Sequence, residues 1–293
     1  MLSEYNYHTR IMGCDFDLTF LAESEEEGDY YFIQALEIAQ NYEEKFSRFR
    51  NESELMQLNT KKSMKMTDDF LEVYEKAQIV YEDTEGGFNS LIQVGRIGYD
   101  RSFEKMKAGD NISFGDLKYN TCMEDIRRDN CELSLKKDQR LDFGGFLKGF
   151  VTQKIAQENK SKGLIINIGG DIYTKGLNAK NKKFIFTILH PQDEKKNIQV
   201  VLKDKALCTS GTYKRKWKYE KKNLHHIVNP YSKISSESDL ISASVICKDG
   251  YIADAYATYA IILGINKAEK FLVSRGVNFV LIDVHGKVRT LIN

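Results

Sequence analysis

One stretch near the end of the chain restricts the possible folds more than any other. Residues 249–264 read "DGYIADAYATYAIILG", and their apolar content predicts a helix that is buried over most of its surface. Its small alanine side chains would let a second backbone approach closely. Yet the helix also carries a carboxylate, Asp254, and a hydroxyl, Thr258. Residues four apart lie on one face of a helix, so the two oxygens point the same way.

Two interpretations of this pair are open. Mg²⁺ selects oxygen ligands and usually keeps phosphate or water in its remaining positions, so the pair would suit a divalent cation. Alternatively, Asp254 is an exposed carboxylate and Thr258 hydrogen-bonds to its own backbone. Taken alone, the helix favours the second interpretation, because such pairs often arise by chance.

Composition excludes several classes of protein. The chain has 293 residues, of which 42% are hydrophobic, enough for a large core. Its 43 basic and 42 acidic side chains nearly balance, which argues against a protein defined by nucleic-acid or membrane electrostatics. The 5 cysteines include no C-x-x-C pair and predict neither disulfides nor a zinc site. With no apolar leader and no long apolar run, we expect a cytoplasmic protein with reduced thiols.

Hydrophobic periodicity predicts a mixture of helices and strands. The predicted helices cover residues 24–46, 67–81, 145–163, 249–264 and 266–274. The predicted strands cover residues 11–22, 164–169, 183–189, 197–202, 241–247, 278–284 and 288–292, with a hairpin turning at 129–130. Only 2 prolines occur, and no linker or repeat divides the chain. We therefore expect an α+β fold, a largely antiparallel sheet with packed helices, forming one intertwined domain over 1–293.

Glycine pairs precede several polar residues. In "LDFGGFLKG", residues 141–149, the pair lies just before a predicted helix with Lys148 in its first turn. Bare amides there would attract an anion, although a tight turn that needs glycine explains the pair equally well. This stretch is neither the P-loop nor the dinucleotide-binding fingerprint. Asp171 follows the pair in "LIINIGGD", where it either binds ligand hydroxyls or caps a turn, and the cap is favoured.

Three other stretches carry candidate side chains. The adjacent histidines of "LHHIVNP", residues 224–230, make a poor chelating pair, but one could act as a general base. When this stretch is taken alone, the favoured interpretation is a pair of partly exposed turn histidines without a catalytic role. Phe49 could stack on a planar ring, although an aromatic near a helix end usually belongs to the core. The basic stretch 212–222 suits a half-buried strand with a solvated face better than a nucleic-acid strip.

In their order and spacing, these stretches resemble the ApbE-type FAD:protein FMN transferases, or flavin transferases. The resemblance runs from Met12 to about Gly264, through "FSRFRNESELMQLN", "GGFN", "LDFGGFLKG", "IINIGGD", "TSGTYKR", "HHIVNP" and "ADAYAT". It implies an ApbE-like fold and a Mg²⁺-dependent enzyme. Such an enzyme moves the FMN half of FAD to a Ser or Thr hydroxyl of an acceptor flavoprotein and releases AMP.

The resemblance also implies roles for individual residues. Asp254 and Thr258 correspond to side-chain metal ligands, Gly145 to a ligand through its carbonyl, and His226 to the base that acts with Asp254 in catalysis. The residues at or beside positions that contact FAD are Met12, Phe49, Gly87, Phe88, Asn89, Asp142, Lys148, Asp171, Thr212 and Ile227.

The residue types suit this chemistry. Mg²⁺ and Lys148 would neutralise charge on a diphosphate, and a base would activate the weak hydroxyl nucleophile. The chain departs from the usual pattern at four places: Cys14 replaces Thr, Phe49 replaces Tyr, Asn89 replaces Asp and Asn229 replaces Asp. Two other functions are therefore considered, an FAD pyrophosphatase that uses water as the nucleophile, and a non-catalytic flavin-binding protein.

Overall fold

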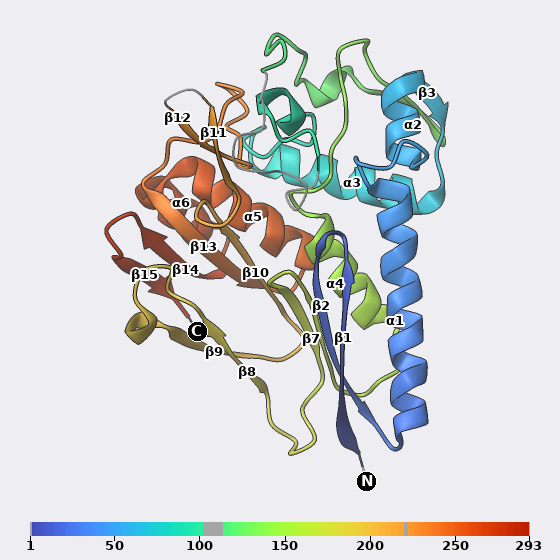
Figure 1. Ribbon diagram of the computed structural model, residues 1–293, viewed down its shortest axis with the longest axis vertical. Coiled ribbons are helices and arrows are strands. Elements are labelled where there is room, and N and C mark those ends of the chain that lie inside the picture. Colours follow the sequence, from blue (N-terminus) through green and yellow to red (C-terminus); the bar gives the residue numbers. More distant parts are fainter. Residues whose placement is uncertain (1, 102–113, 220–221, 293) are drawn as a thin grey trace.

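The fold is organised around one eight-stranded sheet. A computed structural model describes residues 2–101, 114–219 and 222–292 (Figure 1). The strands lie in the order β1-β2-β6-β7-β10-β13-β14-β15, and every neighbouring pair is antiparallel. Their bounds are β1 Ser3–Ile11, β2 Cys14–Ala22, β6 Leu164–Ile168, β7 Asp171–Lys175, β10 Ala206–Gly211, β13 Leu240–Cys247, β14 Asn278–Asp283 and β15 Val288–Leu291. The expected α+β class with a largely antiparallel sheet is confirmed.

Four helices pack on one face of this sheet. They are α1 Glu25–Phe46, α4 Leu147–Glu158, α5 Gly250–Leu263 and α6 Ile265–Ser274. The hairpin of β8, Phe184–Ile188, and β9, Ile198–Leu202, covers part of the other face. In β14, Phe279 belongs to the core under the helices, and its neighbour Val280 belongs to the core under the hairpin. Because successive side chains along a strand point to opposite faces of the sheet, the strands contribute to two apolar layers.

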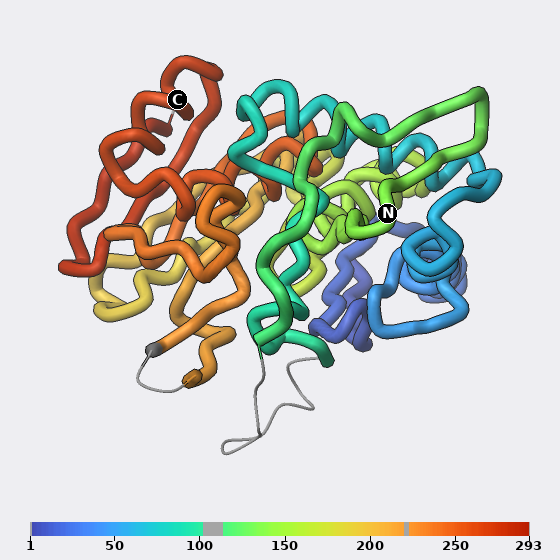
Figure 2. Tube along the Cα trace, turned by 90° about the horizontal axis from the view of Figure 1, so that it is seen from above, coloured from blue at the N-terminus to red at the C-terminus, as the bar shows by residue number. Residues whose placement is uncertain are grey.

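Smaller elements surround the ends of the sheet. They comprise α2 Glu54–Lys61, α3 Asp68–Asp83, and a three-stranded sheet of β3 Ser63–Lys65, β5 Glu132–Ser134 and β4 Arg127–Asp129. The β11 Lys216–Tyr219 and β12 Lys222–His225 hairpin and the 3-10 turns η1 Val94–Ile97, η3 Met123–Asp125 and η4 Glu194–Lys196 complete the described elements. Figure 2 shows the molecule from above, with the blue N-terminal hairpin and the red C-terminal strands on opposite sides.

Helix α1 shows why the sequence pattern predicted its span. Its buried side chains Tyr31, Ala35, Ala39, Tyr42 and Phe46 recur every three or four residues, so one stripe faces the sheet. The Ser24 hydroxyl accepts the Glu27 amide at the N-terminus over 3.3 Å, and three glutamates occupy the first turn. The predicted helix over 24–46 is therefore confirmed almost to the residue.

The strand predicted over 11–22 was wrong at its start. Strand β2 begins at Cys14, because Met12 and Gly13 form the two-residue turn of a hairpin whose first strand, β1, was not predicted. Both turn residues have positive φ, 52° and 68°, which suits the twist of an antiparallel pair. The edge strand β1 has mostly exposed or half-buried side chains, so its sequence carries only a weak strand pattern.

The helix predicted over 145–163 is shorter, and α2 was missed. Helix α4 ends at Glu158 because the next residue, Asn159, turns the chain: its amide oxygen accepts the Ser161 amide over 3.0 Å. Gly163 is therefore not the terminator; its carbonyl accepts the Leu21 amide over 2.8 Å beside the sheet. The other predicted elements lie within about two residues of their predicted bounds.

Two further sequence expectations concern thiols and membranes. All five cysteines are free thiols, so no disulfide staples the fold. Within the three described ranges, no helix combines the length and apolar character needed to cross a bilayer.

Candidate functional site

The site is built where helices α4 and α5 cross. Gly149 of α4 and Gly250 of α5 meet backbone to backbone: a Cβ placed on Gly149 would lie 2.2 Å from the Gly250 carbonyl oxygen. A Cβ on Gly250 would lie 2.0 Å from the Gly149 carbonyl oxygen. Only glycine fits at either position, and the close approach brings the start of α4 against α5 (Figure 1).

Asp254 lies at this crossing and is not an exposed carboxylate. It is 4% exposed, and its Oδ2 accepts the Gly149 amide over 3.1 Å. The Lys148 Nζ lies 3.9 Å from the same oxygen. Burial raises the pKa of the Asp254 carboxyl, and the charge of Lys148, the Gly149 amide and the charge of Arg215 oppose that rise. A buried carboxylate with so few donors has unused capacity for a cation.

Lys148 also pairs with a second buried carboxylate. Its ammonium contacts Asp171, the first residue of β7, whose side chain is 2% exposed. The Thr209 amide of β10 donates to the other Asp171 oxygen over 3.3 Å. Asp171 therefore fixes the ammonium rather than capping the glycine turn before it, contrary to the favoured sequence interpretation. The Lys148 side chain remains 20% exposed, so its free N–H groups can reach an anion.

Thr258 lies one helical turn after Asp254 and faces the glycine pair before α4. Its hydroxyl donates to the Gly145 carbonyl over 3.5 Å and lies 2.9 Å from the Ser210 hydroxyl of β10. The Thr258 hydroxyl thus bonds to neighbouring elements.

The three residues that the resemblance implies as metal ligands present a carboxylate, a hydroxyl and a carbonyl oxygen. This donor set fits a hard cation such as Mg²⁺. Groups of three or more His, Cys, Asp or Glu side chains suited to a metal do not occur among the described residues. A metal ion at α5 would therefore be held by one carboxylate, that of Asp254, together with the Thr258 hydroxyl and the Gly145 carbonyl.

The turn before α4 is held by several side chains. The Asp142 carboxylate accepts the Gly144 amide over 2.9 Å and lies 3.5 Å from Nε of Arg48. The ring of Phe88 packs against Gly145. Asn59 bonds both backbone groups of the residue before Asp142, at 2.7 and 2.8 Å. Asp142 thus orients the glycine turn by accepting the hydrogen bond from the Gly144 amide.

The two adjacent histidines have different environments. Both ring nitrogens of His225 are used, Nε2 with the Ser236 carbonyl at 2.9 Å and Nδ1 with the Ile227 amide at 3.3 Å. In contrast, Nδ1 of His226 is buried and has no partner among the described atoms. Burial lowers the pKa of His226 to about 3, and the charges of Arg215 and Lys148 act in the same direction. His226 is therefore neutral at pH 7.

The remaining predicted residues lie at varied positions. Phe49 is 45% exposed and is not a core residue; the Arg48 guanidinium lies 4.4 Å from its ring centroid. Met12 stands in the β1–β2 turn, where its amide donates to Glu43 over 3.0 Å. Thr212 and Ile227 are buried, and the ring of Tyr259 packs against Gly87.

The structure shows the hydrogen bonds made at two departures from the usual family pattern, Asn229 and Asn89. The amide oxygen of Asn229 accepts the Tyr231 and Ser232 amides over 2.9 and 3.3 Å, a turn role that a carboxylate would also fill. Asn89 likewise accepts the Leu91 amide over 2.8 Å, and its NH₂ group donates to the Thr121 carbonyl over 2.8 Å. Both amides are therefore used to shape loops.

Sequence reasoning missed Arg215, Cys14 and Ser210 as site residues. Nη2 of Arg215 donates to the Cys14 sulfur over 3.3 Å, and its charge acts on both Asp254 and His226. A signal exists in the sequence, because "TSGTYKR" contains Arg215 and Cys14 is one of the departures from the family pattern. Only the packing of β2 against the segment before β11 identifies the arginine as part of the site.

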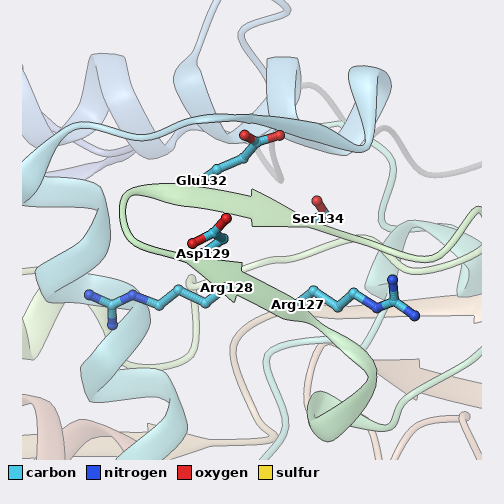
Figure 3. Close-up of a pocket in the computed structure, with 5 residues that line it drawn as sticks. All are labelled: Arg127, Arg128, Asp129, Glu132 and Ser134. Atoms are coloured by element: carbon cyan, nitrogen blue, oxygen red, sulfur yellow. The ribbon is translucent and has the colours of Figure 1, made fainter.

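A separate surface groove lies on the small sheet and contains none of these residues. It is lined by Arg127, Arg128, Asp129, Glu132 and Ser134 of β4 and β5. Figure 3 shows the two arginines pointing in opposite directions along the hairpin, so they do not converge on one ligand.

Comparison with known proteins agrees with the residue pattern. The sequence profile of the ApbE family matches residues 12–281. The chain belongs to the ApbE family. The Pseudomonas stutzeri flavinyl transferase ApbE in its apo form has the same fold, with a TM-score of 0.85 at 16% identity over 100% of this chain and 95% of that one. The ApbE protein of Thermotoga maritima gives a TM-score of 0.86 at 18% identity over 98% and 97%.

Curated relatives match part of this ApbE-family chain. The FAD:protein FMN transferase of Escherichia coli K12 is 25% identical over 154 residues, which cover 51% of this chain and 44% of that protein. The protein of the same name from Buchnera aphidicola of Schizaphis graminum is 32% identical over 127 residues, 42% and 37% of the two chains. The chain thus aligns with less than half the length of these relatives.

Proposed function

We propose that this protein is a Mg²⁺-dependent FAD:protein FMN transferase. It moves FMN from FAD to a Ser or Thr hydroxyl of an acceptor protein and releases AMP. The observation that carries the proposal is the meeting of Asp254, Thr258, Gly145 and Lys148 at the α4–α5 crossing. A buried carboxylate, two neutral oxygens and an ammonium suit a cation together with a diphosphate. The curated relatives carry this activity in their names.

The proposed roles at the diphosphate follow from charge and position. Asp254, Thr258 and the Gly145 carbonyl would hold the cation, and a bound Mg²⁺ would polarise the phosphoryl oxygens of FAD. Lys148, fixed by Asp171, would place its ammonium beside the same phosphates as negative charge grows on the leaving AMP. Burial keeps these charges out of bulk water, where their electrostatic interactions with the phosphates would be weaker.

The transfer is a single substitution at the phosphorus of the FMN half of FAD. The acceptor oxygen forms a bond to the FMN phosphorus, and the bond from that phosphorus to the bridging oxygen breaks. AMP leaves with that oxygen. The proton of the hydroxyl passes to a base, and we assign this role to His226, whose neutral ring has an unpartnered Nδ1.

One incubation distinguishes the proposal from its rivals. The protein is mixed with FAD and Mg²⁺, with and without a cell lysate that supplies acceptors, and proteins are examined by mass spectrometry. The expected result is an FMN-sized adduct on a Ser or Thr, with little FMN and AMP formed when acceptors are absent. Brisk release of FMN and AMP without an acceptor would favour the pyrophosphatase. Intact FAD in every mixture would favour a binding protein.

Substitution of Asp254 tests the metal assignment. Asp254→Asn keeps an oxygen for the Gly149 amide but removes the charge, so we expect transfer to fall at least about 100-fold. Excess Mg²⁺ should restore part of this loss if the defect is cation binding. The matched control is Asp249→Asn at the start of the same helix, whose carboxylate accepts the side-chain amide of Gln153 over 3.4 Å. Equal activity of the Asp254 variant and wild type would reject the assignment.

A further inference from the structure

The guanidinium of Arg215 contacts a sulfur rather than a carboxylate. Its Nη2 donates to the Cys14 sulfur over 3.3 Å, and within the described ranges no carboxylate oxygen lies within 4.0 Å of its guanidinium. Arg48 and Arg275, in contrast, each pair with an aspartate, at 3.5 and 3.0 Å. A thiol is a weak acceptor, so the charge of Arg215 is left largely unmatched.

Cys14 ties this arginine to the Lys148 side of the site. A Cβ on Gly169 would lie 2.8 Å from both Cβ and Sγ of Cys14, so the thiol packs against the turn between β6 and β7. Two residues later, Asp171 holds Lys148. Arg215 and Lys148 therefore approach one region from two elements. The charges of Arg215 and Lys148 also both act on the ring of His226.

We infer that Arg215 is an anion-binding residue that contacts a diphosphate oxygen of FAD, and that the Cys14 thiol positions it. The inference rests on the proposed function for the identity of the ligand. A guanidinium presents a planar set of donors that matches phosphate oxygens. A guanidinium has five N–H donors, so Arg215 can keep its Nη2 on the thiol and present its other donors to phosphate without breaking an ion pair. Cys14, which stands where the resemblance implies Thr, thus gains a positioning function.

The first experiment measures binding and not transfer. Affinities for FAD and for riboflavin, which lacks phosphates, are measured by flavin fluorescence in Mg²⁺ buffer without acceptor, and chromatography confirms that FAD stays intact. Arg215→Met should weaken FAD binding about 10- to 100-fold and leave riboflavin binding unchanged. The matched control is Lys214→Met, which removes a charge from the exposed neighbouring residue and should leave both affinities within about threefold.

The outcomes separate this inference from the proposed function. Wild-type affinity for FAD in Arg215→Met, an equal loss in Lys214→Met, or wild-type protein that binds FAD no better than riboflavin would each overturn the role of Arg215. If binding depends on Arg215 as expected but no FMN reaches any protein, the transferase proposal fails and the anion site stands. Thermal denaturation of each variant excludes unfolding as the cause of a change in affinity.

A second pair of variants tests the positioning role of Cys14. Cys14→Ala removes the acceptor that holds Arg215 and should weaken FAD binding about threefold to tenfold, with riboflavin binding unchanged. Cys14→Ser restores an acceptor at the same position and should recover most of the affinity. Equal FAD affinities in wild type and Cys14→Ala would mean that the thiol only fills space beside Gly169.

Discussion

At the scale of single residues, the site depends on how buried charges are compensated. Lys148 contacts Asp171 and lies 3.9 Å from Asp254, so one ammonium serves two carboxylates that are almost fully buried. Such an arrangement is costly to desolvate, and replacement of charged pairs by neutral groups often preserves stability. The pair is therefore better explained by function than by stability, and the two roles can be separated by mutation.

Lys148→Met should lower the free energy of unfolding by about 3 kcal/mol, because it leaves Asp171 charged, buried and unpaired. The double variant Lys148→Met/Asp171→Asn should regain part of this stability, since Asp171 is then neutral, while Asp254 still lacks the nearby ammonium. Transfer should stay at least about 100-fold below wild type in both variants. Urea denaturation and the FMN-transfer assay are the measurements. Recovered activity in the double variant would show that Lys148 acts only through folding.

His226 predicts a dependence of stability on pH. Its folded pKa, about 3, lies below the value near 6.5 of the unfolded chain. Between these values the unfolded state binds a proton that the folded state does not, so stability is full above pH 6.5 and falls as the pH drops. From pH 7 to pH 5 we expect a loss of about 2 kcal/mol from this group.

Urea unfolding of wild type and His226→Gln at both pH values checks this expectation. The variant should lose less stability at pH 5 than wild type does; the residual loss includes His225, whose pKa burial also lowers. His8→Gln is the control, because His8 is exposed and pairs with Asp17 at the surface. The same pH dependence in wild type and His226→Gln would contradict the neutral state of His226 in the folded protein.

At the scale of elements, the crossing of α4 and α5 determines where the site groups lie. The Gly149–Gly250 contact leaves no room for a side chain and aims the Gly149 amide at Asp254. The glycines are thus important for packing and for the geometry of the carboxylate. Helix propensity alone would favour alanine at both positions.

Gly149→Ala should destabilise the protein by more than about 2 kcal/mol, because the added methyl group would meet backbone 2.2 Å away that cannot shift without parting the helices. Activity should fall further than the folded fraction does, since Asp254 would be displaced. Gly95→Ala is the matched control: its Cβ would meet nothing closer than 3.8 Å. Thermal denaturation and transfer rates are compared for the two variants. Similar behaviour of both would contradict the tight crossing.

At the scale of the whole molecule, residues from distant parts of the sequence form one sheet and one site. Strands β1 and β2 at the start of the chain and β14 and β15 at its end belong to the same sheet. The main core includes side chains from α1 through β14. We therefore expect the chain to unfold as one cooperative unit, as a single domain does.

The single tryptophan, Trp217, tests this expectation. It belongs to a small apolar cluster with Ile97 and Tyr99, apart from the main core, and its indole donates to the Ile97 carbonyl over 3.0 Å. Tryptophan fluorescence and far-ultraviolet circular dichroism should give coincident urea transitions. An earlier fluorescence transition would show that the β11–β12 region unfolds separately and that the chain is not one cooperative domain.

The sequence by itself determined the elements that have strong local signals. The recurring apolar residues and the acidic start of residues 24–46 predicted α1, and the apolar runs at 164–169 and 241–247 predicted β6 and β13 nearly to the residue. These features arise from periodicity and capping, which depend on neighbours along the chain. The order of the family motifs likewise placed Asp254, Thr258, Gly145 and Lys148 in one predicted site.

Only the tertiary structure decided which partner each polar group has. Asp171 could have capped a turn, and its pairing with Lys148 depends on β7 lying beneath α4. The two histidines are adjacent in sequence, yet burial and contacts with distant residues give one of them two hydrogen bonds and leave Nδ1 of the other unpartnered. Local sequence patterns indicate which interactions a side chain can make. Its desolvation and its charged partners depend on elements that meet only after the chain has folded.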